Sequence, residues 1–509
     1  MADVSKAAVL LLKDILKSAG GDALKYFPVR LVPALTALIT VPVFTRMLTT
    51  ADYGDFALVT STVSLIALVA TSWINGAIVR FYWAYDKLGR RDDFIGSTVW
   101  SLASTLGLAA ALALAFGYLF ADVLPPGIVR LLPIGVASLA VNNFMLSSLQ
   151  VYRAANKASA YAILSVATTI TATSMSIFFV TVPQLGAYGI LLGAVLGNLI
   201  LFPFNLYHLR KEGSLSPRHL KRDVVNDFAG YGLPLVPAAI SSWLLVLADR
   251  YIIGFIQTTG EVGLYSVAYG LGDKVMQLIV MPLAITMGPV MIRTFEQQGQ
   301  DLAQQVQSQF TRYFSMATMP LLFGIAAVAR HFMGVFTGAE FREAYPILAI
   351  VATAAMLNGL VQIAGTGVAL HKRTTITMSN TLTAAAFNIV ANIALVPVYG
   401  YMAAAYTTVA SYLLLLGLTY TRSRPYMAWH IPWFDVGRIV AAAAIMGGAI
   451  FVIFGRLPAS VGVLAVEVVF GIVVYAVALL ALGGLKPDER AFAGELGRAA
   501  LARLGWRRR

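Results

Sequence analysis

Long apolar runs separated by short polar turns recur from one end of the chain to the other. Most of these runs are close to the roughly 20 residues that a helix needs to cross a bilayer. The pattern therefore predicts a chain of fourteen membrane-spanning helices. Their expected bounds are 28–47, 56–79, 94–120, 127–150, 159–182, 187–208, 228–250, 262–292, 310–335, 344–368, 375–397, 400–420, 437–456 and 460–483.

Polar segments divide these runs into groups. At the N-terminus, leucines and isoleucine between 11 and 16 lie opposite lysines, which is typical of an amphipathic helix at the membrane interface rather than a cleavable signal. The expected organisation is an interfacial segment at 1–27, an N-lobe at 28–208, a cytoplasmic linker at 209–227, a C-lobe at 228–420, a cytoplasmic loop at 421–436, two further spans at 437–483 and a basic cytoplasmic tail at 484–509.

Two short sequence motifs occur once in each expected lobe. "TTADYGDF" begins at Thr49 and "TTGEVGLY" at Thr258, each after the first span of its lobe. "VPQLGAYG" begins at Val182 and "VPVYGYMA" at Val396, each after the fifth span. The two motifs occur in the same order in both halves, so we expect a parallel repeat with a substrate path between its halves. The predicted fold class is an all-α polytopic membrane protein with two six-helix lobes plus two C-terminal helices.

Composition agrees with a membrane protein. Apolar residues make up 59% of the chain, and the mean hydropathy is +0.77. Charged residues make up 12%, whereas a soluble protein carries roughly a quarter. The chain has no cysteine, which excludes disulfides and thiolate metal sites.

The net charge of +13 has two interpretations, nucleic-acid binding or basic loops beside anionic lipids. The apolar pattern favours the second, so we expect contact with membrane lipids and none with nucleic acid. If the N-terminus is cytoplasmic, most of the 37 Lys and Arg residues fall inside, and both termini lie in the cytoplasm. The basic residues expected outside are Arg46, Arg130, Arg250, Arg330, Arg342 and Arg456.

One basic residue lies near the middle of a predicted span. Lys274 shares a helix face in the span at 262–292 with Asp273 and Gln277. Charge in hydrocarbon is expensive, so such a residue is a functional candidate by default. Two interpretations stay open. The residues either form a structural ion pair, or they line a hydrated cavity and meet an anionic substrate or a coupling ion.

Other candidates lie near span ends or inside apolar runs. Three arginines have two possible roles: their side chains either extend to lipid headgroups or bind phosphate through the planar guanidinium. They are Arg30, Arg80 and Arg250. Asp249 is a candidate for coupling or ion pairing. Span amides either hydrogen-bond between helices or meet sugar hydroxyls; they include Asn75, Asn142, Asn143, Asn358 and Gln362. Proline pairs predict bends in the first and seventh spans, at Pro33, Pro42, Pro234 and Pro237.

Two motifs resemble a known family. "LITVPVFTRMLTTADYGDFALV" and "LADRYIIGFIQTTGEVGLYSVAYGL" are similar to the patterns of the polysaccharide-transport branch, with its O-antigen flippases, of the multidrug/oligosaccharidyl-lipid/polysaccharide exporter superfamily. The resemblance covers essentially the whole chain. It implies alternating access of two lobes around a cationic cavity that flips polyprenyl-diphosphate-linked oligosaccharide for O-antigen, capsule or exopolysaccharide synthesis, in a bacterial inner membrane.

The expected substrate-binding residues are thus Lys274, Arg30, Arg80, Arg250, Asn142 and Gln277, with Asp273 and Asp249 as coupling or ion-pair candidates. A coupling ion, H⁺ or Na⁺, a polysaccharide polymerase and a chain-length regulator are candidate partners. No phosphate loop, metal-ligand spacing or long outer loop is present, so we expect no cofactor, no metal and no enzyme activity. The alternatives are a peptidoglycan-precursor (lipid II) flippase or a drug antiporter of the same superfamily, and a non-transporting scaffold.

Overall fold

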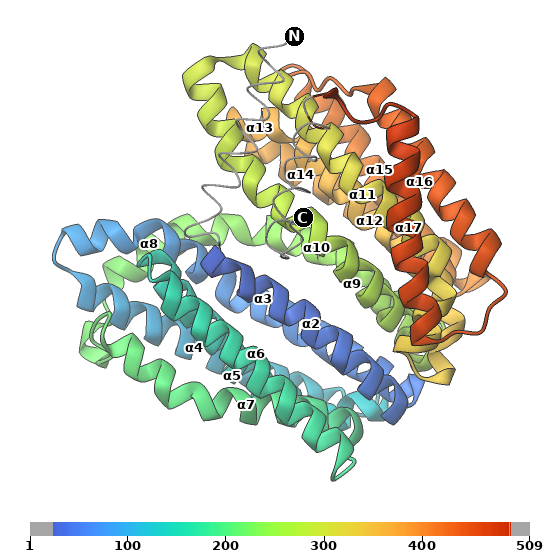
Figure 1. The fold of residues 1–509 in the computed structure, drawn as a ribbon. Helices are drawn as coiled ribbons and strands as arrows, with labels where there is room; N and C mark the ends of the chain where they lie inside the picture. Colours follow the sequence, from blue (N-terminus) through green and yellow to red (C-terminus); the bar gives the residue numbers. More distant parts are fainter. Residues whose placement is uncertain (1–23, 488, 490–509) are drawn as a thin grey trace, which may run out of the picture.

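The computed structural model describes residues 24–487 and 489, and its regular elements are all helices (Figure 1). The long helices are α2 (Leu24–Met47), α3 (Thr50–Lys87), α4 (Arg91–Leu119), α5 (Pro126–Ala154), α6 (Ala158–Thr181), α7 (Gly186–Arg210), α9 (Val236–Ile256), α10 (Thr259–Gln298), α11 (Gln300–Phe336), α12 (Tyr345–Ala364), α14 (Thr374–Tyr399), α15 (Tyr401–Ser423), α16 (Trp433–Phe454) and α17 (Val461–Ala481). Shorter elements are η2 (Pro217–His219), α8 (Arg222–Gly232), η3 (Leu233–Leu235), η4 (Ala339–Ala344) and α13 (Thr366–Leu370).

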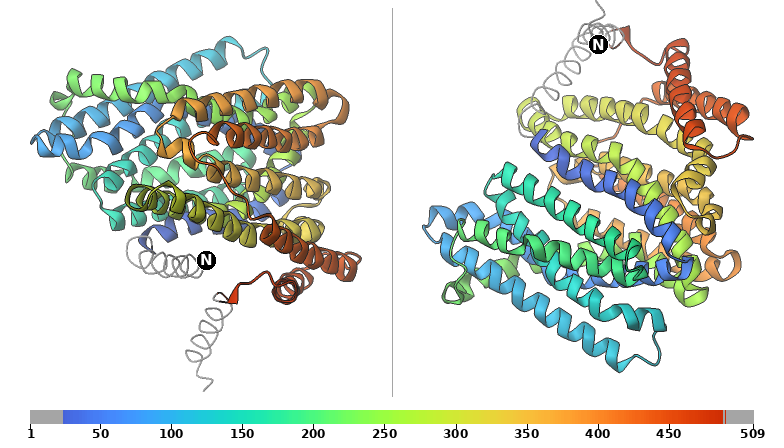
Figure 2. Two further views of the ribbon diagram at one scale, coloured as in Figure 1. Left: turned by 90° about the horizontal axis from the view of Figure 1, so that it is seen from above. Right: turned by 60° about the horizontal axis from the view of Figure 1, so that its bottom comes forward.

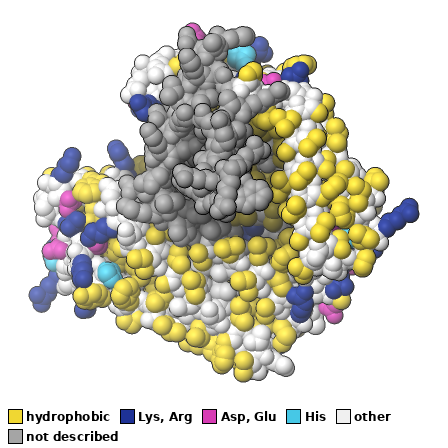
Figure 3. Space-filling model, in the orientation of Figure 1, with side chains coloured by type: hydrophobic (Ala, Val, Ile, Leu, Met, Phe, Trp, Pro, Cys, Tyr) yellow, Lys and Arg dark blue, Asp and Glu magenta, His cyan; other side chains and the backbone are white. Residues whose placement is uncertain are grey.

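The predicted fold class is confirmed. Thirteen helical stretches in the described part are long and apolar enough to cross a membrane, and α2 contributes a shorter apolar helix at Leu35–Met47. Together they correspond in order to the predicted spans. Apolar side chains cover the lower and right parts of the face shown in Figure 3, and charged side chains gather at its left edge, where α8 and neighbouring helix ends lie.

The seventh span differs from a single predicted helix. It begins earlier, as α8, and is interrupted by η3 before it continues as α9. Pro234 and Pro237 lie at this interruption, and proline lacks the N–H that a continuous helix requires. Helix α8 packs against α3 and α4, whereas α9 packs mainly against α14. In contrast, α2 continues without interruption past all three of its prolines, Pro28, Pro33 and Pro42.

The two halves of the chain repeat the same neighbour relations. Helix α2 packs on α6 as α9 packs on α14, and α3 packs on α5 as α10 packs on α12. Likewise α5 and α6 both pack on α7, as α12 and α14 both pack on α15. Figures 1 and 2 show the halves as two bundles. The exact domain borders stay predictions; the interfacial segment and the basic tail lie largely outside the described residues.

Buried charges attach the two C-terminal helices to α11. Arg312 is 1% exposed; it donates to Glu489 and to the Gly484 carbonyl at 2.6 Å, and its Nε lies 3.1 Å from a carboxylate oxygen of Asp435 in an ion pair. Near the other end of α11, Nδ1 of His331 lies 2.6 Å from Oε1 of the buried Glu467 on α17. Pairing of this kind is what permits ionisable groups among membrane helices.

Candidate functional site

The duplicated Thr-Thr motif forms the junction between the halves. Thr49 and Thr258 cap α3 and α10 in the same way, each accepting a hydrogen bond from the backbone N–H three residues later. The two capped helix ends cross at Gly54 and Gly263. A Cβ added to Gly54 would lie 1.8 Å from the carbonyl oxygen of Thr259 on α10, and one added to Gly263 would lie 2.0 Å from the matching oxygen on α3. Only glycine permits this approach.

Further contacts between the halves surround this crossing. The backbone N–H of Gly338 donates to Thr45 at 3.0 Å, and Arg46 donates to the Val335 carbonyl at 2.7 Å. Deeper along α3, Thr62 and Ser64 hydrogen-bond to Tyr251 and Trp243 of α9, at 2.8 and 2.9 Å. The end of the bundle that carries the duplicated motif is therefore closed.

Lys274 on α10 is exposed and forms no ion pair with any described residue. Asp273 beside it is half-buried and accepts a hydrogen bond from Gln277 at 3.4 Å. The structure thus places the three side chains of the predicted stripe together, but Asp273 does not contact the lysine directly as an ion pair. An exposed, unpaired ammonium within an apolar helix is available to an anion.

Arg250 and Asp249 are neighbours in α9, yet they meet different partners. Arg250 is 7% exposed; it donates to the Val246 carbonyl at 3.1 Å, and its guanidinium lies 4.8 Å from the ring centre of Tyr269. A cation over an aromatic face is stabilised by the ring quadrupole. In this conformation Arg250 is therefore held inside the C-terminal half, whereas sequence reasoning placed it at the membrane surface or the cavity.

Asp249 is fully buried at the centre of a polar cluster. Its carboxylate accepts from Tyr265 of α10 at 2.5 Å, from Asn392 of α14 at 3.0 Å and from Thr408 of α15 at 2.9 Å. Asn392 also donates to Asn388 at 3.1 Å. Hydrogen-bond donors from three helices, two hydroxyls and one amide N–H, therefore converge on one buried carboxylate. A buried carboxylate without a cationic partner at its oxygens favours taking up a proton or a hard cation.

Sequence reasoning identified Asp249 but not its partners. Asn388 and Asn392 of α14 lie four residues apart, so they share a helix face, and this spacing was the available signal. Within the described residues, no group of three or more His, Cys, Asp or Glu side chains could hold a metal ion.

The remaining candidates lie apart from these clusters. Arg80 is exposed on α3, and the side chain of Arg30 on α2 lies outside the described part. Asn142 donates to Ser138 at 2.7 Å and accepts from Asn198 of α7 at 2.8 Å. Its amide thus takes part in interhelical packing of the N-terminal half, the first of the two roles considered for span amides.

The arrangement of the helices is similar to that of solved membrane proteins. A structure titled as the lipid II flippase MurJ in an inward closed conformation matches with a TM-score of 0.68 and 14% identity, covering 90% of this chain and 97% of that one. An inward-facing multidrug resistance MATE family transporter of the MOP superfamily matches with a TM-score of 0.58 and 12% identity, covering 79% and 95%. These likenesses establish the fold.

Residues 43–346 match the family described as polysaccharide biosynthesis protein, and the chain belongs to that family. It is 24% identical over 260 residues to a probable low-salt glycan biosynthesis flippase, Agl15, of Haloferax volcanii. That alignment covers 50% of this chain and 52% of the relative, so the chain spans about half the length of the curated relative it matches. The family resemblance predicted from the two motifs is confirmed.

Proposed function

We propose that the protein is a flippase that moves a lipid-linked glycan across the membrane. The family membership and the relative named as a glycan flippase support this class, and both agree with the expectation that the chain is not an enzyme. The expected substrate is a polyprenyl-diphosphate-linked oligosaccharide used for O-antigen, capsule or exopolysaccharide. The observation that carries the proposal is the exposed Lys274 in mid-span, which has no ion-pair partner in the part of the chain that the structure describes and where a diphosphate would find its counter-charge.

Alternating access would follow from the way the halves meet. The crossing at Gly54 and Gly263 closes the end that the charge bias places outside. Transport requires that these helix ends separate while the opposite ends approach. The interruption between α8 and α9 is a suitable hinge, because α8 is packed on the N-terminal half whereas α9 is packed mainly on the C-terminal half.

The cluster around Asp249 is the best candidate for coupling to H⁺ or Na⁺. Its ligands come from α9, α10, α14 and α15, so their spacing depends on how these helices pack. A cation that binds one packing better than the other shifts the equilibrium by that difference in affinity. Arg80 and Arg30 would capture the diphosphate at the cytoplasmic entrance, with Arg250 and Gln277 deeper inside.

We place the protein in a bacterial inner membrane with both termini in the cytoplasm, beside a polysaccharide polymerase and a chain-length regulator. Deletion of the gene should then cause a lipid-linked oligosaccharide to accumulate on the cytoplasmic leaflet. Accumulation of a lipid-linked peptidoglycan precursor, or drug sensitivity with no accumulated intermediate, would support the two alternatives instead. The likeness to the lipid II flippase concerns the fold and does not choose among substrates.

Complementation of the deletion strain tests the role of Lys274. Lys274→Gln should insert and melt like the wild type, because the side chain has no ion-pair partner among the described residues, but it should not restore export. Lys274→Arg, which keeps the charge, should restore part of it. Full export by the glutamine variant would remove Lys274 from the substrate path.

A further inference from the structure

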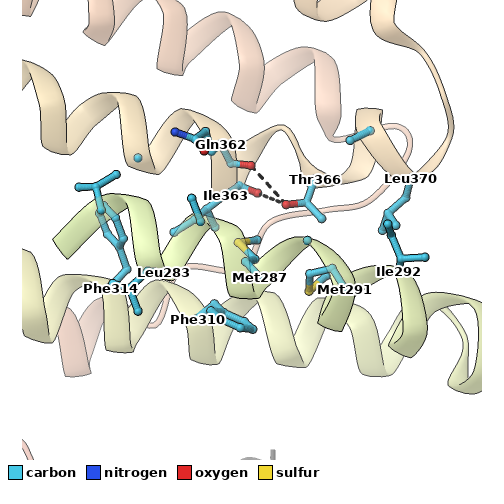
Figure 4. Close-up of a pocket in the computed structure, with 15 residues that line it drawn as sticks. Leu283, Met287, Met291, Ile292, Phe310, Phe314, Gln362, Ile363, Thr366 and Leu370 are labelled. Carbon is cyan, nitrogen blue, oxygen red and sulfur yellow. Dashed lines mark hydrogen bonds between the residues drawn. The ribbon is translucent and has the colours of Figure 1, made fainter. Parts of the chain in front are cut away.

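A cavity of about 230 Å³ lies between α10, α11, α12 and α13 (Figure 4). Met287 and Met291 of α10 lie between Ile363 of α12 and Phe310 of α11. Both methionines and Phe310 are buried, so the cavity penetrates between packed helices. An apolar cavity of roughly 150 Å³ is already large enough to hold benzene and stays free of water. This cavity can therefore take a hydrocarbon group.

The polar groups at its wall do not change this chemistry. The hydroxyl of Thr366, at the start of α13, donates to the carbonyl of Ile363 in the last turn of α12 at 2.8 Å, so its polar group is satisfied locally. The side chain of Gln362 is exposed at the margin. The interior therefore offers methionine and aromatic surfaces, which adapt to irregular apolar shapes.

The cavity continues the polar stripe of the proposed substrate path. Along α10, Asp273 and Gln277 are followed by Ala284, Met287 and Met291. Successive members of this series are three, four or seven residues apart. At this spacing all five side chains lie on one face of the helix. Met287 is 13 residues beyond Lys274, or about 20 Å along the axis. A lipid-linked substrate whose polar head lies at the stripe would thus find an apolar cavity for its tail on the same face of α10.

We propose that the cavity binds the isoprenoid tail of the lipid carrier while the diphosphate lies at Lys274. The inference rests on the proposed function and adds a tail site to it. The tail would occupy the half of α10 that leads to the predicted cytoplasmic end. The carrier would then stay anchored in the inner leaflet after its head has reached the middle of the membrane.

Gly288 provides a variant that fills the cavity. It lines the cavity, and a Cβ added there would meet no atom within 4 Å, so Gly288→Leu occupies the space without a backbone clash. Gly417 of α15 is an exposed helical glycine with the same open surroundings away from the cavity. Gly417→Leu is therefore the matched control.

The test uses the full chain in lipid nanodiscs and a polyprenyl phosphate that carries a photoreactive diazirine in its tail. Mass spectrometry should find label in the segments around Met287 and Phe310, and unlabelled polyprenyl phosphate should compete it away. Gly288→Leu should lower this labelling about tenfold, which corresponds to about 1.4 kcal/mol, whereas Gly417→Leu should not change it. Unchanged labelling in a folded Gly288→Leu variant would place the tail elsewhere.

A diazirine-bearing phosphatidylglycerol provides the second arm. If this lipid labels the same segments and competes equally well, the cavity holds ordinary phospholipid and the proposal fails. This comparison needs only the wild-type protein, so it tests the proposal even if Gly288→Leu does not fold. Label at the Lys274 segment without label at the cavity overturns the tail site and leaves the flippase intact. Absence of label at both segments would count against the proposed function itself.

Discussion

Gly263→Ala places a methyl group at the point where the two halves of the protein cross. Its Cβ would lie 2.0 Å from the backbone oxygen of Thr50, whereas ordinary contacts begin at 3.4 Å. The three nearest atoms belong to the backbone of α3, which cannot rotate away as a side chain can. The two helices must therefore move apart by roughly 1 Å or more, and overpacking of this kind costs typically 1–3 kcal/mol.

The cost applies to the closed conformation of this end and not to an opened one. A penalty of 1.4 kcal/mol shifts an equilibrium tenfold, so the variant should favour the state in which this end is open. The chain contains no cysteine, so Ser64→Cys introduces a single thiol beside the contact between the halves. A membrane-impermeant maleimide added from the outside should label this thiol about tenfold faster in Gly263→Ala than in the parent.

The control is Gly417→Ala, also in a helix but with open surroundings. Alanine in a helix interior is favoured over glycine by roughly 0.5–1 kcal/mol, so this control should melt at the same or a slightly higher temperature, with unchanged labelling. Equal labelling rates for Gly263→Ala and the parent, in protein that folds normally, would refute the interpretation of the crossing as a gate.

Three further predictions concern the candidate residues and the orientation. Arg80→Ala should weaken substrate capture roughly tenfold or more while Arg80→Lys keeps partial export; export assays beside protein levels decide this, and a fully active alanine variant would leave only a role at the headgroups. Asp249→Asn keeps the shape of the carboxylate but removes its charge, so uptake of substrate into vesicles should lose its response to an imposed H⁺ or Na⁺ gradient; an unchanged response would remove Asp249 from coupling. Reporter fusions at Gly213 should read cytoplasmic and fusions at Gly400 external, and an external signal at Gly213 would invert the topology.

Much of the architecture could be read from the chain because hydropathy is a local property. A run of about 20 apolar residues must become a membrane helix wherever it lies, since its backbone has no other way to satisfy its hydrogen bonds in lipid. The repeated Thr-Thr motif indicated the duplication for the same reason, because both copies cap a helix through contacts within four residues. Lys274 and its stripe needed only the 3.6-residue period of one helix.

The contacts between helices required the tertiary structure. The sequence around Gly54 and Gly263 does not indicate that they lie against each other. Likewise it does not indicate that Asp249 is surrounded by partners from three other helices, or that Asn142 hydrogen-bonds to α7. Lipid tails are as apolar as leucine, so hydrophobicity does not decide which face of a span meets which neighbour. That choice depends on close packing and on a few interhelical hydrogen bonds, which exist only once the helices are assembled.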